Sequence, residues 1–334
     1  MTVRSTCVFA CLALFASNVL ASDLRTEAPP EQAYSAFLED RSSRFGFWVG
    51  IWDVNVLTPD DSGELVPHET AEASVYPILG KGAILELWGA RSHASLGLHF
   101  YDAQSQSWQS WHLVQQDGRT AVQHQLGRFS HGRGEFKSAP DLPAEDKVTS
   151  AVSYSDVTPF SLRRDLHQSS DGGETWRRVA THEYTRSSVE PRPLTRRTLP
   201  TATSGQECTD SRFADFGYLV GSWESESARF EARSILNGCA VLGILEDSLG
   251  PDHFFVVTFD VEQERWTAWA LSDDVETGFK AYAGASTWGE LQASDDRTGS
   301  IEWAILHSGP GSLGDPGDKF FYRVDERSIE FVRP

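Results

Sequence analysis

The stretch Phe45–Trp52 (FGFWVGIW) recurs later in the chain as Phe216–Trp223 (FGYLVGSW). Both copies place Phe-Gly, Val-Gly and a final Trp at the same spacing. Two further blocks recur in the same order, 78–83 with 235–240 and 101–111 with 259–269. Three ordered matches indicate an internal repeat of one fold. The offset between copies falls from 171 to 157 after the first block, so the first copy is longer, and we place its extra residues in the polar turn Thr58–Gly63.

Each copy has the pattern of short strands joined by turns. Leu96–Tyr101 and Trp108–Val114 are rich in residues that strands favour and flank a polar six-residue turn. Phe254–Phe259 and Trp266–Leu271 repeat this hairpin in the second copy. The chain also has 11 Trp, 19 Phe and 27 Gly but one Met, which favours strands and turns over helical bundles. We therefore predict an all-β protein built as antiparallel sandwiches or barrels.

The 334 residues are enough for two domains, each with its own core. Ser187–Glu207 lies between the copies and contains three prolines with few large apolar residues, which is typical of a linker. Before the first copy, Glu31–Asp40 has apolar side chains at helical spacing and predicts a short amphipathic helix. The predicted ranges are 31–186 for the first domain, 187–207 for the linker and 208–334 for the second domain.

Residues 1–21 have the features of a signal peptide. Arg4 supplies the positive region, and the apolar run Cys7–Phe15 is too short to cross a bilayer. Val19–Ala21 offers aliphatic and small residues before a cleavage point. A buried first helix is the alternative. We expect a periplasmic or secreted protein.

The net charge of −19 argues against nucleic acids and anionic membranes as partners, since both require a basic surface. No later stretch has about 18 consecutive apolar residues, so no stable membrane insertion is expected. The expected partner is a small molecule, and the oligomeric state is left open.

Two cysteines, Cys208 and Cys239, follow the signal segment. In an oxidising compartment such a pair is expected to form a disulfide, and two unpaired thiols are the alternative. Two cysteines alone do not predict a metal site.

The motif Gly-x-Trp at 50–52 and 221–223 resembles the first-strand signature of the lipocalin-like (calycin) superfamily. The resemblance implies that Trp52 and Trp223 each close the floor of a barrel. It also implies that an arginine from a late strand packs across each tryptophan, and Arg186 and Arg333 are the matching residues. The expected fold is therefore two tandem antiparallel lipocalin-like β-barrels with a short N-terminal helix.

The wider pattern is similar to a bacterial domain family of unknown function. Its marks are Gly-x-Trp, Leu-x-Gly-x-Ala, Tyr-Asp with Trp-x-x-Trp, and Asp-Gly-Gly-x-Thr-Trp, the last at Asp171–Trp176. The second copy has Leu-x-Gly-x-Ala at 236–240 but lacks the Asp-Gly-Gly hairpin. The Asp171 segment also matches the Asp-box of sialidase-type propellers, but it occurs once, and a hairpin turn pinned by Asp171 is the favoured interpretation. The neighbouring Arg163–Arg164 pair is interpreted as a solvated strand edge.

Eight of the ten histidines lie in the first copy. His99, His112 and His124 align with residues of the second copy that are not histidine, namely Val257, Ala270 and Tyr282. This asymmetry places the candidate site in the first domain. Imidazoles on neighbouring strands could converge on a metal, a haem iron or a polar ligand, whereas solvent-facing histidines are the alternative. Because no short His spacing supports a metal, no metal site is predicted and the cofactor is left open.

Strand alternation allows one of Trp111 and His112 to face inward. We expect Trp111 inside, because the second copy retains it as Trp269 but replaces His112. Glu86 can face the cavity or solvent with equal ease. The candidate ligand-binding residues are Glu86, Trp88, His99, Trp111 and His124.

The chain lacks Gly-x-Ser-x-Gly and the glycine loops of nucleotide sites. The leading hypothesis is an exported protein that binds a small, mostly apolar ligand in the first barrel. The first alternative is a barrel enzyme, a cyclase, isomerase or hydrolase, that uses His99 or His124 as general acid or base. The second is a non-catalytic interaction module with a filled barrel.

Overall fold

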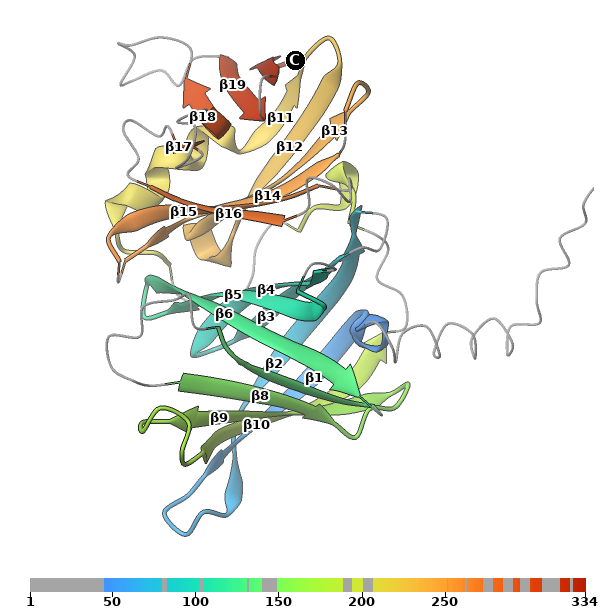
Figure 1. The fold of residues 1–334 in the computed structure, drawn as a ribbon, viewed down its shortest axis with the longest axis vertical. Coiled ribbons are helices and arrows are strands. Elements are labelled where there is room, and N and C mark those ends of the chain that lie inside the picture. The colour runs from blue at the N-terminus through green and yellow to red at the C-terminus, as the bar shows by residue number, and fades with distance from the viewer. Residues whose placement is uncertain are drawn as a thin grey trace, which may run out of the picture. The chain divides into compact units, whose positions relative to one another are not determined.

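The computed structural model describes two antiparallel sheets and four short 3-10 helices in the described part of the chain (Figure 1). This confirms the all-β class. The described residues are 45–79, 83–102, 105–130, 132–139, 149–188, 194–200, 207–250, 252–261, 263–272, 279–284, 291–294, 301–307, 319–324 and 327–334. The predicted signal peptide and the predicted helix at 31–40 lie outside these residues.

The first sheet is a closed ten-stranded barrel in which each strand pairs with its neighbours in sequence. Its first strand also pairs antiparallel with its last, Val54 opposite Tyr184, and this pairing closes the cylinder. The strands are β1 (Gly50–Pro59), β2 (Leu65–Ile78), β3 (Ala83–Ala90), β4 (His93–Asp102), β5 (Ser107–Gln116), β6 (Arg119–Ser130), β7 (Arg133–Ser138), β8 (Thr149–Ser155), β9 (Ser161–Ser169) and β10 (Arg177–Ser188).

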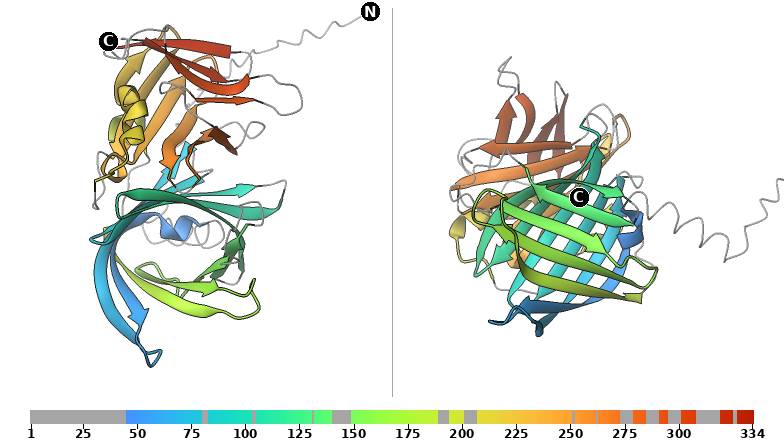
Figure 2. Two further views of the ribbon diagram at one scale, coloured as in Figure 1. Left: turned by 90° about the vertical axis from the view of Figure 1, so that its left-hand side faces the viewer. Right: turned by 60° about the horizontal axis from the view of Figure 1, so that its bottom comes forward.

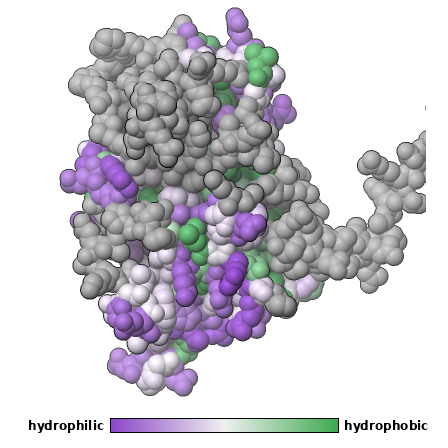
Figure 3. Space-filling view, in the orientation of Figure 1, coloured by the Kyte–Doolittle hydropathy of each residue, from purple (hydrophilic) through white to green (hydrophobic). Residues whose placement is uncertain are grey.

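Alternation along each strand separates an interior from an exterior face. On β1, Trp52, Val54 and Val56 are buried in the barrel core, whereas Asp53 and Asn55 are exposed. Hydrophilic side chains accordingly cover much of the barrel surface in view in Figure 3. A period of two places every second residue inside, so register decides which side chains meet there.

The helix η1 (Gly46–Trp48) is enclosed by the strands of the barrel and plugs one end of the interior (Figure 2). Phe45, at the start of η1, packs against Phe136 and Tyr154 of the wall. The Trp48 carbonyl accepts a hydrogen bond of 2.8 Å from the Trp52 indole Nε1. This end of the barrel is therefore closed by apolar side chains.

Arg186 of β10 fixes this plug. Its guanidinium lies 3.9 Å from the centroid of the Trp52 ring. It also donates hydrogen bonds to the carbonyls of Phe47, Val49 and Pro159 at 2.9, 2.7 and 2.6 Å. The structure thus places the arginine across the tryptophan, in the arrangement that the sequence resemblance implied.

Gly50 explains the glycine of the first Gly-x-Trp. A Cβ at this position would lie 1.9 Å from Arg186 Nη1 and 3.2 Å from Trp52 Nε1. A residue with a side chain here would displace the guanidinium. In the second copy the reason differs, because Gly221 has φ +128°, which side-chain-bearing residues rarely adopt.

The second copy forms a ten-stranded curled sheet. Its hydrogen-bonded order begins at β16 and ends at β17, so the pairing between described residues leaves it open where the first sheet is closed. The strands are β11 (Gly221–Glu224), β12 (Ala228–Ile235), β13 (Ala240–Asp247), β14 (His253–Asp260), β15 (Arg265–Ser272), β16 (Phe279–Gly284), β17 (Leu291–Ser294), β18 (Ile301–His307), β19 (Lys319–Val324) and β20 (Arg327–Val332).

The floor device recurs in this sheet. The Trp223 indole donates to the carbonyl of Leu219, in the helix η4 (Ser211–Leu219), at 2.8 Å. Arg333 lies 4.7 Å from the Trp223 centroid and donates to the Tyr218 carbonyl at 3.2 Å. The repeat seen in the sequence is therefore a repeat of one structural motif.

The extra residues of the first copy lengthen its first hairpin. β1 and β2 have ten and 14 residues, whereas β11 and β12 have four and eight. The insertion therefore extends both strands as well as the turn that the sequence suggested. Among the described residues, no helix is long and apolar enough to cross a membrane.

Cys208 and Cys239 form a disulfide with a Cα–Cα distance of 5.4 Å. It ties the segment before η4 to the helix η5 (Leu236–Gly238), at whose end Cys239 is buried. Within the predicted linker, the described residues 194–200 include the helix η3 (Arg196–Thr198). Leu194 and Leu199, on either side of this helix, are buried.

Removing the Arg186 guanidinium tests the plug. We expect Arg186→Ala to lower the free energy of unfolding by about 2–4 kcal/mol, because three carbonyls lose a charged donor. Gly50→Ala should produce a similar loss by displacing the same group. Both are measured by urea unfolding, followed by Trp fluorescence.

Arg333→Ala is the matched control in the second copy, where Arg333 contacts one carbonyl and one ring among the described residues. We expect it to have the smaller effect. Equal losses for the two arginines would contradict the role assigned to Arg186.

Candidate functional site

A cluster of polar side chains lies inside the first barrel. Glu86 of β3, His99 of β4 and Ser110 and His112 of β5 are all at most 3% exposed. Strand pairing brings them together: Glu86 lies opposite Gly97, which lies opposite His112, and His99 lies opposite Ser110. The other members come from across the barrel, Tyr154 of β8, Arg164 of β9 and Tyr184 of β10.

Ser110 joins the two imidazoles. Its hydroxyl lies 2.8 Å from His99 Nδ1 and 2.8 Å from His112 Nε2. A hydroxyl has one proton and two lone pairs, so Ser110 can donate to one imidazole while it accepts from the other. The protonation pattern of His99 is therefore coupled to that of His112.

Glu86 lies at the far side of His99. Its Oε2 is 3.9 Å from His99 Nε2 and 3.5 Å from Arg164 Nη1, and its Oε1 accepts from the Tyr184 hydroxyl at 3.4 Å. The first two distances exceed those of good hydrogen bonds. The carboxylate is thus loosely held by groups that surround it.

Burial dominates the electrostatics of the cluster. It raises the pKa of Glu86 above 4.5, although Arg164 and His112 oppose the shift. It lowers the pKa of His99 and of His112 well below 6.5, and the positive charge of Arg164 adds to both shifts. The imidazoles are therefore neutral, and the Arg164 guanidinium is the positively charged group at the centre of the cluster.

Gly97 provides the room for this arrangement. A Cβ at this position would lie 2.7 Å from His99 Nε2, 3.1 Å from Glu86 Oε2 and 3.2 Å from His112 Cε1. The glycine thus opens the wall where three functional groups converge.

Aromatic rings of the plug cover the cluster on one side. Phe45 stacks on His99 with 4.9 Å between centroids, and Trp48 lies 5.2 Å from the same imidazole. Arg164 lies 5.9 Å from the Trp48 centroid and 5.8 Å from that of Tyr154. The plug therefore shields the polar groups from solvent at this end.

A second group of rings lies further along the interior. His182 of β10 stacks on Trp88 of β3 at 5.4 Å and 12°, and His93 lies 4.3 Å from Trp88. Small side chains on β2, Ala71 and Ala73, leave room for the two rings to meet. Burial lowers the pKa of His182 well below 6.5.

Several buried polar atoms of this interior make no hydrogen bond among the described residues. They are Glu86 Oε2, His99 Nε2, Arg164 Nε, Trp88 Nε1 and His182 Nδ1. Each such atom costs about 1–3 kcal/mol when it is left unsatisfied, so native proteins keep few of them. All five atoms belong to side chains that face the interior of the first barrel.

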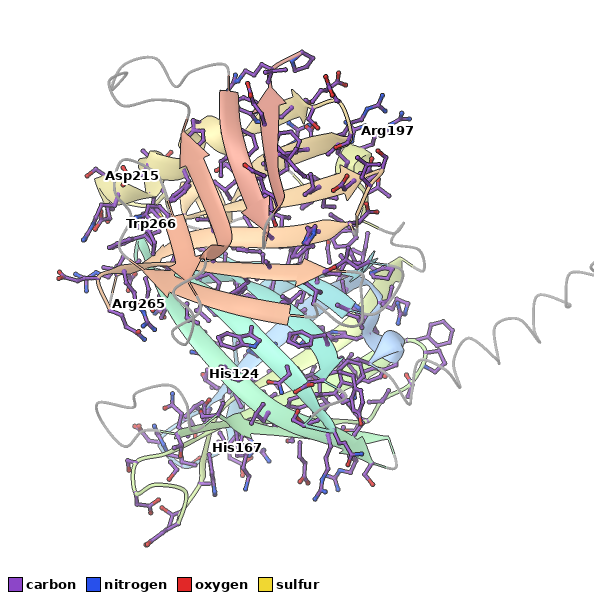
Figure 4. All side chains as sticks on the ribbon, turned by 45° about the horizontal axis from the view of Figure 1, so that its top comes forward. His124, His167, Arg197, Asp215, Arg265 and Trp266 are labelled. Carbon is purple, nitrogen blue, oxygen red and sulfur yellow. A yellow bond between two sulfur atoms is a disulfide. The ribbon has the colours of Figure 1, made fainter. Side chains whose placement is uncertain are left out.

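Of the sequence-predicted ligand residues, the structure brings Glu86, Trp88 and His99 into the interior. Trp111 and His124 lie on the outside, in the row that pairs Leu98, Trp111 and His124. The two rings stack with 3.9 Å between centroids, and His124 Nε2 lies 2.6 Å from Gln109 Oε1. Figure 4 labels His124 on β6 and His167 on β9 and shows them well apart.

The prediction that Trp111 rather than His112 faces inward is wrong. His112 shares the interior face with Ser110, and Trp111 lies 5.8 Å from its counterpart Trp269 on β15. The described residues of both sheets belong to one compact unit, so the outer face of β5 is also buried. The tryptophan retained in both copies packs the copies together instead of lining a cavity.

Sequence reasoning missed Arg164, Ser110, Tyr154 and Tyr184. Arg164 was interpreted as part of a solvated edge, but it is 8% exposed and faces inward, whereas Arg163 pairs with Asp165 on the outer face. The signal available was alternation: Leu162, Arg164 and Leu166 share one face of β9. An arginine in a row of leucines indicates a buried charge.

Asp171 pins its hairpin as the sequence predicted. Its carboxylate accepts hydrogen bonds from the Thr175 backbone at 2.9 Å, from the Thr175 hydroxyl at 2.5 Å and from Ser169 at 2.6 Å. These bonds hold the pKa of Asp171 well below its usual value of 3.8. This set is that of a turn, with its acceptor oxygens already occupied.

Two other features lie outside the cluster. An open groove of about 700 Å³ on the barrel is lined by polar and apolar residues near β1, β2 and β3, among them Asp53, Val54 and Glu72. Within the described part of the chain, no group of three or more His, Cys, Asp or Glu side chains is placed to hold a metal ion.

No family model and no curated protein matches the chain. Among solved structures, it is similar to a protein of unknown function from the DUF3598 family of Nostoc punctiforme, with 10% sequence identity. The alignment covers 87% of this chain and 96% of that one, with a TM-score of 0.25. A superposition of this quality supports no argument about fold or function.

The buried imidazoles predict acid sensitivity. Their depressed pKa values mean that the folded state favours the neutral rings, so this stability is present above about pH 6.5 and is lost as the pH falls below it. We expect His99→Gln to reduce the loss of stability between about pH 7.5 and about pH 5. Urea midpoints at the two pH values measure it.

His167→Gln, at a half-buried position outside the barrel interior, is the matched control and should keep the acid sensitivity of the parent protein. An unchanged acid response in His99→Gln would show that the buried imidazoles are not its source.

Proposed function

We propose that the first barrel binds a small molecule in its interior. The observation that carries this proposal is the set of unsatisfied buried polar atoms on β3, β4, β9 and β10. A structural core would gain stability by replacing these groups with apolar ones of similar volume. A bound molecule that supplies the missing hydrogen-bond partners accounts for their presence.

The accessible side of the interior is opposite the plug. Arg164 and Ser95 are each 8% exposed and His182 is 6% exposed, whereas Glu86 and His99 are fully buried. Ser95 lies near the start of β4, at the end remote from η1, and His182 lies midway along β10. The ligand therefore enters from the side of Trp88 and His182 and reaches toward Glu86.

The lining specifies a ligand of mixed character. Trp88, Val54 and Val56 offer apolar contact, and Arg164, His112 and Glu86 offer hydrogen bonds. A molecule with an apolar body and a polar end group fits this pattern. The Gly-x-Trp motif and the arginine stacked on its tryptophan support a lipocalin-like assignment of the barrel.

We also propose that the protein is exported, as residues 1–21 predict. The disulfide between Cys208 and Cys239 supports this, because structural disulfides persist in oxidising compartments.

Native mass spectrometry of the protein purified from its own host tests the binding proposal. We expect a discrete additional mass that is released on denaturation. Ala71→Leu, which adds bulk to the interior, should reduce its occupancy, whereas Glu72→Leu on the outer face should not. A mass without ligand in the folded protein, together with an unchanged Ala71→Leu variant, would contradict interior binding.

A second candidate function is acid–base catalysis in the interior of the same barrel. The chain from Ser110 through His99 to Glu86 is the observation that favours it, since a hydroxyl, an imidazole and a carboxylate lie in sequence. His99 would accept the proton of Ser110 or of a water as that oxygen bonds to an ester carbonyl carbon, and would return the proton when the C–O bond to the leaving group breaks. Glu86 would hold the ring in place.

Turnover of an activated ester, p-nitrophenyl acetate, tests this alternative. We expect Ser110→Ala to lower the rate by about 10²-fold or more with little change in the unfolding midpoint. Ser153→Ala, on the outer face of β8, should keep the full rate. If the parent protein and Ser110→Ala hydrolyse the ester equally slowly, the catalytic candidate fails.

A further inference from the structure

We propose that Arg164 binds an anionic group of the barrel's ligand and that Glu86 takes up a proton as it does so. The proposal rests on the interior binding site put forward above and specifies its chemistry: the polar end of the ligand is an acid, such as a carboxylate.

The contacts of Arg164 leave donors available. A guanidinium carries five N–H donors, and Arg164 has a hydrogen-bond partner in the Tyr184 hydroxyl. The nearest carboxylate oxygen, Glu86 Oε2, is 3.5 Å from Nη1, and Nε has no acceptor among the described residues. Trp48 and Tyr154 present ring faces to the group, which offer no lone pairs in its plane. The group is a buried cation with an incomplete set of acceptors.

An anion can complete that set. Two parallel N–H···O bonds to a carboxylate are shorter and stronger than the present contact at 3.5 Å. Arg164 is also the most exposed member of the cluster, with 10% of its side chain accessible, whereas Glu86 has none. An entering ligand therefore meets the cation before it meets the carboxylate.

Such a ligand would remove the counter-ion of Glu86. The groups that face Glu86 are His99 from β4, His112 from β5, Arg164 from β9 and Tyr184 from β10, with Tyr154 of β8 close enough for its pKa to respond to the carboxylate. On its own sheet neighbour β2, the opposite residue is Val75, which is apolar. Once Arg164 pairs with the ligand, two negative charges would lie close together in a desolvated interior, which is unfavourable.

Protonation of Glu86 resolves this conflict. The proton comes from the solvent, forms an O–H bond on the carboxyl group and leaves the total charge of the site unchanged. The new hydroxyl faces His99 Nε2, which has no hydrogen bond at present. His99 and His112 are poorer recipients, because burial and the adjacent guanidinium both disfavour a charged ring.

Calorimetry with decanoate and decanol tests the proposal, because the probes share a chain and differ in charge. We expect the parent protein to bind decanoate about tenfold more tightly than decanol. Arg164→Met should abolish this preference. Arg163→Met is the matched control, since Arg163 lies on the outer face beside Asp165 and should leave the preference intact.

Proton uptake is measured by repeating the titration in two buffers of different ionisation enthalpy. As the pH rises and Glu86 becomes ionised in the free protein, we expect uptake to approach one proton per decanoate. The affinity should fall as the pH rises, because each binding event then requires a proton. Glu86→Gln should bind decanoate without proton uptake and with an affinity that no longer depends on pH.

The outcomes distinguish the anion site from the proposed binding of a small molecule in the barrel interior. Equal binding of decanol and decanoate, or a preference that survives Arg164→Met in a folded variant, overturns the anion site but keeps the interior binding site. Decanoate binding without proton uptake at any pH overturns the role of Glu86. Failure to bind either probe overturns the proposed binding function together with its extension.

Discussion

The packing of Arg186 on Trp52 sets the position of everything inside the first barrel. The guanidinium joins β10 to the start of β1 and holds three carbonyls on the segments around the plug. With the plug fixed, Phe45 and Trp48 lie against His99, and the polar cluster is sealed from one end. Because one end is closed, whatever contacts Arg164 and Glu86 must come from the other. The closed floor has a structural role, and it restricts access to the interior to the opposite end.

The second copy forms the equivalent strand pairs without the residues of the cluster. At the repeat offsets, Glu86 corresponds to Gly243, His99 to Val257, Ser110 to Ala268 and His112 to Ala270. The pairing is conserved as well: Gly243 lies opposite Phe255 as Glu86 lies opposite Gly97, and the Phe255 ring takes the space over Gly243. In the second copy the Phe255 ring fills the region over Gly243, whereas in the first copy Gly97 leaves room for three polar groups.

The repeat, the all-β class and the arginines that pack on Trp52 and Trp223 were accessible from the sequence, because a strict spacing of Gly, Trp and turn residues reports backbone geometry. The side that each histidine faces was not. Alternation shows that Trp111 and His112 face opposite sides of the strand. Which of them faces the barrel interior depends on which side of the strand is the interior, and the sequence does not show that. Here both faces of β5 are covered, one by the barrel interior and one by Trp269. Arg164 was missed for a related reason, since an Arg-Arg pair on a strand necessarily sends one member to each side.

The energetic position of the cluster is the strongest argument that it serves binding. A buried arginine and a buried glutamate lose several kcal/mol of hydration each, and a contact of 3.5 Å with few supporting hydrogen bonds recovers little of it. The equivalent region of the second copy, around Gly243 and Phe255, is apolar and has no such cost. Selection for stability alone would favour apolar residues here as well. The imperfect pairing of Glu86 with Arg164 is intelligible if the arginine has a second partner part of the time. On this proposal, the Glu86 carboxylate pairs with Arg164 when no acidic ligand is bound. Protonation of Glu86 then allows the ligand to replace it as the partner of Arg164.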